Sequence, residues 1–326
     1  MPSKPLLEVE DLKVHFPVYG GILSRKPLGA VQAVDGVSFQ LAAGKTLGLV
    51  GESGCGKSTT GLAVLRMLAP TAGHIRFDGT DITEADSATM RPFRRRLQMI
   101  YQDPFGALDP RMTVAAIIAE PMIVHGISAS AADRRGRVTE LLEMVGLRPD
   151  MAGRYVHEFS GGQRQRIGIA RALAMQPELL ICDEPVSALD VSIQAQIVNL
   201  FRSLQDRFGM AYLFIAHDLA VVRHVSDQIA VMYLGRIVEI ASSAELYTNP
   251  RHPYTKALLA AVAIPDPDVE ATRPHIPMTG EVPGAMNPPT GCRFHPRCPL
   301  AVTRCRTESP VLRALSDAQS VACHLV

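Results

Sequence analysis

A glycine-rich stretch, GESGCGKSTT at residues 51–60, has the residue types needed to bind a polyphosphate. Its three glycines allow the backbone to curl so that the N–H groups point inward at an anion. Lys57 can then reach the outer phosphates, and the Ser58 hydroxyl can bind Mg²⁺. The match to the pattern G-x-x-x-x-G-K-[ST] predicts that the following residues bind a nucleotide: Gly51, Glu52, Ser53, Gly54, Cys55, Gly56, Lys57, Ser58 and Thr59.

The flanking sequence supplies the elements that such a loop requires. The apolar run TLGLV at 46–50 predicts a buried parallel strand, and GLAVLRML at 61–68 has helical spacing. A helix that starts at the loop adds the positive end of its dipole to the anion site. Because Lys57 and this helix both favour a thiolate, we expect Cys55 to react with alkylating agents and bound MgATP to protect it.

A second apolar strand ends in two acids, in the sequence ELLICDEP at 178–185. Ligands in open α/β sheets bind at the carboxyl ends of strands, so both acids are expected to face the nucleotide. Asp183 would hold Mg²⁺ through water, and Glu184 would polarise the water that attacks the γ-phosphorus. The alternative is a surface acid pair that caps a turn.

A third stretch, FSGGQRQRIGIARAL at 159–173, offers another anion-binding helix start. Ser160 and the N–H groups of Gly161 and Gly162 precede a helix that we expect to begin near Gln163. One chain does not need two such sites for one phosphate. Taken alone, SGG before a helix would be interpreted as a flexible cap.

This third stretch resembles the signature motif of ATP-binding-cassette (ABC) ATPases, and other motifs of that family follow the same order. Gln102 in MIYQDP resembles the Q-loop, Asp190 in SALD the D-loop, and His217 in FIAHDL the switch histidine. The resemblance implies an α/β P-loop fold of the ABC type. It has a RecA-like core, an antiparallel β subdomain and an α-helical subdomain, here at about 104–160, that carries the signature.

The resemblance also assigns roles to individual residues. Catalysis would fall to Glu184, His217 and Gln102, and Mg²⁺ binding to Ser58, Gln102 and Asp183. In this family the signature of one subunit completes the ATP site of its partner in a head-to-tail dimer, here through Ser160, Gly161, Gly162 and Gln163. The adenine base would stack on Phe16, with Tyr19 as the alternative, because the loop PVYGGILSRKPLG is inserted there.

The C-terminal part narrows the family. NPRHPYTKALLAAV at 249–262 and the proline-rich PMTGEVPGAMNPPTGCRFHPRCP resemble ATPase subunits of bacterial dipeptide and oligopeptide importers, most of all the second, F-type subunit. We therefore expect a cassette at 1–245 and a peptide-importer extension at 246–326. The implied function is ATP hydrolysis that energises peptide import. The implied partners are two transmembrane permease subunits, a second ATPase subunit and an extracytoplasmic binding protein.

Other functions remain open at this stage. Relatives with similar tails carry nickel complexes or glutathione. A soluble cassette protein of DNA repair or translation would usually have a coiled-coil insertion or two cassettes, and neither is apparent. The third alternative is a metal or redox sensor in which ATP only regulates.

Four of the six cysteines lie in the tail, at Cys292, Cys298, Cys305 and Cys323. Disulfides conflict with a reduced compartment, and zinc sites usually show C-x₂₋₄-C pairs, which this tail lacks. Four thiolates can also hold a [4Fe–4S] cluster, and the resemblance to peptide-importer ATPases implies one. Zinc and four unliganded cysteines are the alternatives. We interpret His252, between Arg251 and Pro253, as a turn residue and not a metal ligand.

Composition argues against three other classes of protein: nucleic-acid-binding, secreted and membrane-spanning. The chain has 326 residues and a formal net charge of +1. Nucleic-acid-binding proteins usually carry a clear excess of basic residues, and this chain does not. The N-terminal MPSKPLLEVEDLKVHF has acids where a signal peptide needs an apolar core, and the longest apolar runs are too short to cross a bilayer. We expect a peripheral protein at the cytoplasmic face of the plasma membrane.

Overall fold

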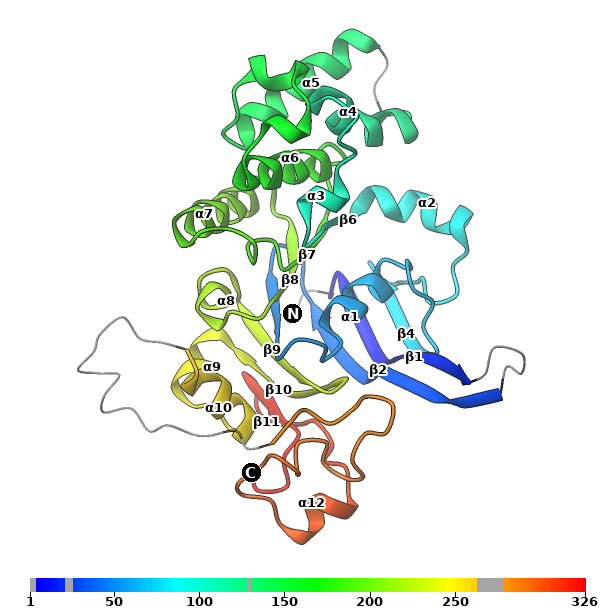
Figure 1. The fold of residues 1–326 in the computed structure, drawn as a ribbon, viewed down its shortest axis with the longest axis vertical. Coiled ribbons are helices and arrows are strands. Elements are labelled where there is room, and N and C mark those ends of the chain that lie inside the picture. The colour runs from blue at the N-terminus through cyan, green and yellow to red at the C-terminus, as the bar shows by residue number, and fades with distance from the viewer. Residues whose placement is uncertain (1–3, 21–25, 128–129, 263–277, 279) are drawn as a thin grey trace, which may run out of the picture. The chain divides into compact units, whose positions relative to one another are not determined.

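The computed structural model describes residues 4–20, 26–127, 130–262, 278 and 280–326 (Figure 1). The inserted loop after Phe16 and the proline-rich stretch lie partly outside these residues. The chain divides into two compact units. The first comprises Met1–Ala42, Thr46–Glu84 and Ala216–Val326, and the second comprises Ala43–Lys45 and Ala85–Ile215.

An antiparallel sheet of four strands forms one part of the first unit, in the order β2-β1-β4-β5. Its two long strands form a hairpin whose register runs from the pair Leu7 and Leu41 to the pair Gly20 and Lys26. The inward side chains of β1 are apolar and buried at alternating positions, which is the period of a half-buried strand. The strands are β1 (Leu7–Gly20), β2 (Lys26–Leu41), β4 (Ala72–Phe77) and β5 (Thr80–Asp81).

The first unit also contains a mixed set of strands in the order β11-β12-β10-β9-β3. Strands β3 and β9 are parallel, whereas β10 pairs antiparallel with both β9 and β12. The strands are β3 (Thr46–Val50), β9 (Gln228–Tyr233), β10 (Arg236–Ser242), β11 (Arg313–Ser316) and β12 (Gln319–Val321). The helices of this unit are α1 (Lys57–Val64), α8 (Leu219–Val225), α9 (Ser243–Thr248), α10 (Pro253–Ala260) and α12 (Thr303–Thr307).

Three parallel strands form the centre of the second unit, with β7 between β6 and β8. All residues of β7 are buried, as expected for a parallel strand covered on both faces. The strands are β6 (Leu97–Ile100), β7 (Leu179–Asp183) and β8 (Ala211–Ala216). The α-helices are α2 (Ser87–Arg96), α3 (Pro104–Ala107), α4 (Val114–Val124), α5 (Ala131–Met144), α6 (Gly161–Leu173) and α7 (Val191–Phe208), with 3₁₀ turns η1 (Pro149–Gly153) and η2 (Val156–Glu158).

Polar caps define the helix starts of the second unit. Thr113 caps α4, Ser130 caps α5 and Ser160 caps α6, each through a side-chain oxygen that accepts a backbone N–H of the first turn. The helices α4, α5 and α6 pack on one another through buried aliphatic side chains such as Ile118 and Leu141. This packing holds the start of α6, where the signature sequence lies.

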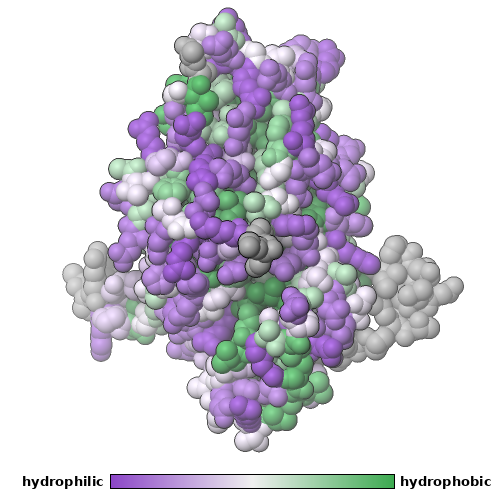
Figure 2. Space-filling view, turned by 180° about the vertical axis from the view of Figure 1, so that it is seen from behind, coloured by the Kyte–Doolittle hydropathy of each residue, from purple (hydrophilic) through white to green (hydrophobic). Residues whose placement is uncertain are grey.

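The surface combines polar and apolar side chains (Figure 2). Exposed apolar residues include Ile123 and Val124 at the end of α4 and Val191 at the start of α7. Within the described residues, no helix has both the length and the apolar character needed to cross a membrane.

Candidate nucleotide-binding site

The loop from Gly51 to Gly56 joins β3 to α1, as the glycine pattern predicts. Gly51 and Gly56 have φ angles of 152° and 106°. A Cβ at Gly51 would lie 2.1 Å from the carbonyl oxygen of Met232, and one at Gly56 would lie 2.0 Å from that of Ala33. Only glycine fits at these two positions, because both the backbone conformation and the close approach exclude a side chain.

Lys57 lies at the first position of α1 and is only 4% exposed. Its Nζ donates to the carbonyl oxygens of Gly51 at 2.8 Å and Glu52 at 3.0 Å. The helix cap, Gly56, makes no side-chain hydrogen bond to the first turn. The N–H groups at this helix start therefore have no side-chain cap, and a phosphate is the kind of group that binds there.

The expectation of a reactive Cys55 is wrong. Its side chain is 5% exposed, and burial raises its pKa, although the Lys57 ammonium acts in the opposite direction. A raised pKa leaves less thiolate at neutral pH, and burial also restricts access to reagents. Sequence spacing identified the nearby cation but could not show how strongly the loop excludes water.

Two residues of the C-terminal part contact the loop, and the sequence did not predict either contact. The Tyr254 hydroxyl on α10 accepts the backbone N–H of Glu52 at 2.9 Å. Arg297 donates to both carboxylate oxygens of Glu52, at 2.7 Å and 3.0 Å. The sequence features that could have indicated the Arg297 contact were an acid at the second position of the loop and two arginines in the segment CRFHPRC.

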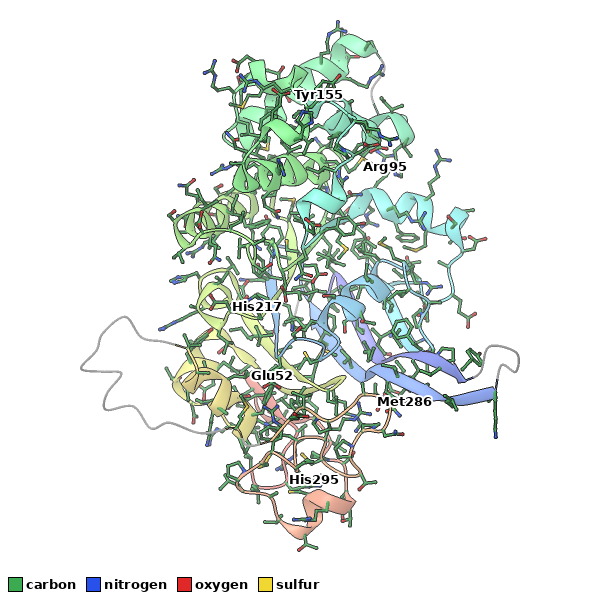
Figure 3. All side chains as sticks on the ribbon, viewed as in Figure 1. Glu52, Arg95, Tyr155, His217, Met286 and His295 are labelled. Atoms are coloured by element: carbon green, nitrogen blue, oxygen red, sulfur yellow. The ribbon has the colours of Figure 1, made fainter. Side chains whose placement is uncertain are left out.

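The first unit also contains four residues that the sequence suggested as base-stacking, catalytic or turn residues. Phe16 lies on β1 opposite Val31 and is 39% exposed, and Tyr19 is 56% exposed near the end of the same strand. His217 follows β8 directly and has an exposed side chain (Figure 3). His252 is the N-cap of α10, where its Nδ1 accepts the Tyr254 N–H, and burial lowers its pKa to about 3.

The second unit brings Gln102 and Glu184 together. The Gln102 Nε2 donates to Glu184 Oε2 at 2.8 Å, so the amide is hydrogen-bonded to the carboxylate that we expect to be catalytic. Glu184 has a φ of 44°, an uncommon backbone conformation for a non-glycine residue. Its N–H donates to the Ile215 carbonyl of β8 at 2.9 Å, which fixes the turn after β7.

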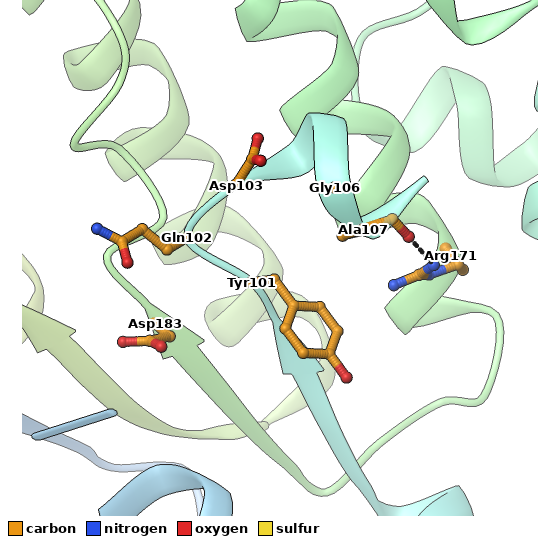
Figure 4. A pocket seen from close by; sticks show the side chains of 7 residues that line it. All are labelled: Tyr101, Gln102, Asp103, Gly106, Ala107, Arg171 and Asp183. Atoms are coloured by element: carbon orange, nitrogen blue, oxygen red, sulfur yellow. Dashed lines mark hydrogen bonds between the residues drawn. The ribbon is translucent and has the colours of Figure 1, made fainter. Parts of the chain in front are cut away.

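Asp183 is the last residue of β7 and is 7% exposed. It lines a pocket of about 490 Å³ together with Tyr101, Gln102, Asp103, Gly106, Ala107 and Arg171 (Figure 4). On the far side of this pocket, Arg171 donates to the Ala107 carbonyl at 2.7 Å. The carboxylate and amide oxygens in this pocket are groups that suit Mg²⁺.

The signature residues form a self-contained cap at the start of α6. The Ser160 Oγ accepts the Gln163 N–H at 3.4 Å, and the Gln163 side chain accepts the Ser160 N–H at 3.0 Å. The helix begins at Gly161, two residues before the expected position. A Cβ on Gly162 would lie 2.6 Å from Ile193 Cγ2, whereas Gly161 has room for one. Asp190 is the N-cap of α7 and makes no side-chain cap hydrogen bond.

The four tail cysteines are thiols and form no disulfide. Burial raises the pKa of Cys292 to about 11, and the neighbouring thiolates of Cys305, Cys298 and Cys323 add to this increase. No group of three or more His, Cys, Asp or Glu side chains is arranged to hold a metal ion anywhere in the described residues.

Together, the P-loop, the buried acid at the end of β7 and the capped signature helix define an ABC-type ATPase. The family model for ABC transporters matches residues 34–187, and the model for the oligopeptide/dipeptide transporter C-terminal region matches residues 238–305. Two solved structures share the fold. The dimeric post-hydrolysis ATP-binding cassette MJ0796 with ADP and Pi has a TM-score of 0.65 at 26% identity, covering 73% of this chain and 98% of that one. CbiO1 of Clostridium perfringens has a TM-score of 0.64 at 25% identity, covering 76% and 92%.

Curated relatives match over nearly the whole chain. The oligopeptide transport ATP-binding protein AppF of Bacillus subtilis is 52% identical over 99% of this chain and 98% of its own length. The putative oligopeptide transport ATP-binding protein YkfD of the same organism is 53% identical over 100% and 97%. The chain belongs to the ABC ATPase family, in the group with an oligopeptide/dipeptide transporter C-terminal region.

Proposed function

We propose that this chain is the ATP-hydrolysing subunit of a peptide importer. The observation that carries this proposal is the match of both parts of the chain, cassette and C-terminal region, to proteins named for oligopeptide transport. A nickel complex or glutathione as substrate is the alternative within the same mechanism. The division into a cassette at 1–245 and an extension at 246–326 is part of this proposal.

The proposed mechanism distributes ATP binding and hydrolysis among the described motifs. Lys57 and the uncapped start of α1 bind the phosphates, and Ser58, Gln102 and Asp183 bind Mg²⁺. Glu184 accepts a proton from the attacking water, and His217 contacts the γ-phosphate. Gln102 donates to one oxygen of Glu184, so this hydrogen bond orients the carboxylate and leaves its other oxygen as the acceptor for the proton.

Replacing Glu184 with Gln tests this assignment. The amide keeps the size of the side chain but cannot accept the proton, so hydrolysis should fall by about a hundredfold or more while MgATP still binds. The matched control is Glu178→Gln, which alters an acid at the opposite end of β7 that pairs with Arg96 on the surface. Near-normal turnover in Glu184→Gln would remove Glu184 from the mechanism.

The proposed partners are two permease subunits, a second cassette ATPase and, through the complex, a binding protein. The signature residues Ser160, Gly161, Gly162 and Gln163 and the D-loop residue Asp190 would then serve the second ATPase. The location would be the cytoplasmic face of the membrane. Affinity purification from membranes should recover two membrane proteins and a second ATPase, with ATP turnover stimulated by peptide and binding protein. Recovery of DNA-repair or translation factors instead would contradict the proposal.

The four tail cysteines are proposed to bind a [4Fe–4S] cluster, with zinc as the alternative. The type and number of donors suit such a group, because four cysteine sulfurs are the usual ligands of a [4Fe–4S] cluster. The described side chains are not arranged as a metal site in this structure, so binding would require the four sulfurs to converge. Bound, such a group would supply a structural cross-link for a loop-rich segment. Protein purified without oxygen should contain about four iron atoms per chain, which is the number in such a cluster. One zinc and no iron would favour the alternative.

A further inference from the structure

Glu52, in the phosphate-binding loop, is held at two points by the C-terminal part of the chain. Its backbone N–H donates to Tyr254, and its carboxylate receives two hydrogen bonds from Arg297. The Arg297 side chain is 7% exposed and that of Glu52 is 24% exposed. A two-bond pair of this kind is among the strongest and most directional of side-chain contacts, especially when water has limited access.

Contacts outside the phosphate-binding loop also hold Arg297 in place. Its guanidinium lies over the Tyr233 ring, 5.9 Å from the centroid, and its backbone N–H donates to Phe294 at 3.0 Å. Phe294 is 2% exposed and packs against Tyr233 and Tyr254, with centroid distances of 5.2 Å and 5.3 Å. An aromatic cluster from β9, α10 and the cysteine segment therefore orders the arginine.

The contact extends from Glu52 to Lys57. The Glu52 carbonyl accepts a hydrogen bond from Lys57 Nζ at 3.0 Å, so the position of Glu52 helps to set that of the ammonium. We propose that Arg297, in the cysteine segment, is a positioning residue for ATP binding that acts through Glu52 on the phosphate-binding loop. This inference rests on the proposed function as an ATPase.

A purely structural role would make a different prediction, and the same segment supplies the control. Arg293 has a side chain that is also 7% exposed, and it anchors the segment to Gln32, Asp35 and the Leu234 carbonyl. The hydrogen bonds that Glu52 receives from the cysteine segment come from Arg297. If Arg297 only secured the segment, then loss of either arginine would affect ATP binding equally.

The experiment compares Arg297→Met and Arg293→Met in the full chain with its partner subunits. Arg297→Met should raise the Kd and the KM for MgATP by about tenfold, as expected for a lost hydrogen-bonded ion pair, and change kcat by less than about twofold. Arg293→Met should lower the melting temperature but leave KM within about twofold. Arg297→Lys should recover part of the affinity.

Glu52→Gln removes the other charge of the same ion pair and leaves the sequence of the cysteine segment unchanged. It therefore tests the inference even if the Arg297→Met variant fails to fold. It should raise KM to a similar degree, and the double variant Glu52→Gln with Arg297→Met should be no worse than either alone. An equal rise of KM in Arg293→Met, or an unchanged KM in Glu52→Gln, overturns the inference. If wild-type protein binds no MgATP, the proposed function fails as well; if only the variants show no effect, the positioning role alone fails.

Discussion

The two helix starts proposed to bind phosphate, those of α1 and α6, are built in opposite ways. Gly56 leaves the start of α1 without a side-chain cap, and contacts 202 and 245 residues away in the sequence hold the preceding loop at Glu52. Ser160 and Gln163 cap the start of α6 within four residues of sequence. The first start is shaped by the tertiary fold, and the second by its own sequence. A locally formed cap would suit the proposed role of this motif, in which it is presented to a second ATPase subunit.

The largest effect is expected at the α1 start. Replacing Lys57 with Ala removes the buried ammonium, and MgATP affinity should fall by about a hundredfold or more, because charge-assisted hydrogen bonds to phosphate are lost. Equilibrium binding of MgATP measures this effect. Lys256→Ala, which removes an exposed lysine from α10, is the control and should bind normally. Equal affinity in Lys57→Ala and wild type would contradict a ligand site at α1.

A smaller effect is expected at the α6 start. Ser160→Ala removes one half of the capping box, which costs about 1 kcal/mol of helix stability. If this cost is expressed fully at the ATP site that the signature is proposed to complete, hydrolysis by the assembled complex should fall by about fivefold. MgATP binding to the isolated chain should not change.

The control for Ser160 is Ser130→Ala, which removes an equivalent cap from α5, where Ser130 Oγ accepts the Asp133 N–H at 3.1 Å. It should leave hydrolysis nearly unchanged. A loss of MgATP binding by the isolated Ser160→Ala chain would show that the two helix starts are not separate in function.

The smallest effect at neutral pH concerns His252, which supports the loop at α1 through Tyr254. Burial lowers its folded pKa to about 3 from an ordinary value of 6.5, so the unfolded chain takes up a proton that the folded chain excludes as pH falls below 6.5. The free energy of unfolding should therefore decrease by up to about 1.4 kcal/mol per pH unit between pH 6 and pH 4.

His252→Asn keeps an acceptor at the N-cap without this titration, so denaturant unfolding across that pH range should show a shallower slope. His224→Asn, an exposed histidine on α8, should keep the wild-type slope. Identical slopes in His252→Asn and wild type would mean that His252 does not account for the pH dependence.

The parts of the site that the sequence predicted are local motifs. The P-loop between β3 and α1 and the two acids at the end of β7 follow from short patterns, because adjacent residues determine a strand, a turn and a helix start. The ABC-type fold as a whole, with its β and helical subdomains, was expected from the resemblance to the family and not from these patterns. The interpretation of His252 as a turn residue agrees with its position at the start of α10.

The parts that it missed depend on tertiary packing. Nothing in the sequence near Tyr254 or Arg297 indicates that both side chains reach Glu52, since those contacts need β9, α10 and the cysteine segment to assemble first. The error at Cys55 has the same origin. The cation two residues away is visible in the sequence, but the burial that raises the pKa of the thiol is not.

The pairing of β12 with β10 has a consequence for the order in which the chain folds. Gln319 donates to the fully buried carboxylate of Glu239 at 2.8 Å, and the two residues are 80 positions apart. Contacts of such long sequence separation form slowly, because loop-closure entropy opposes them until much of the fold exists. On refolding, β9 and β10 should therefore pair first, with β12 and its neighbour β11 joining in a later kinetic phase. Until that phase is complete, Glu239 retains access to water, and the edge of β10 is open to pairing with other chains.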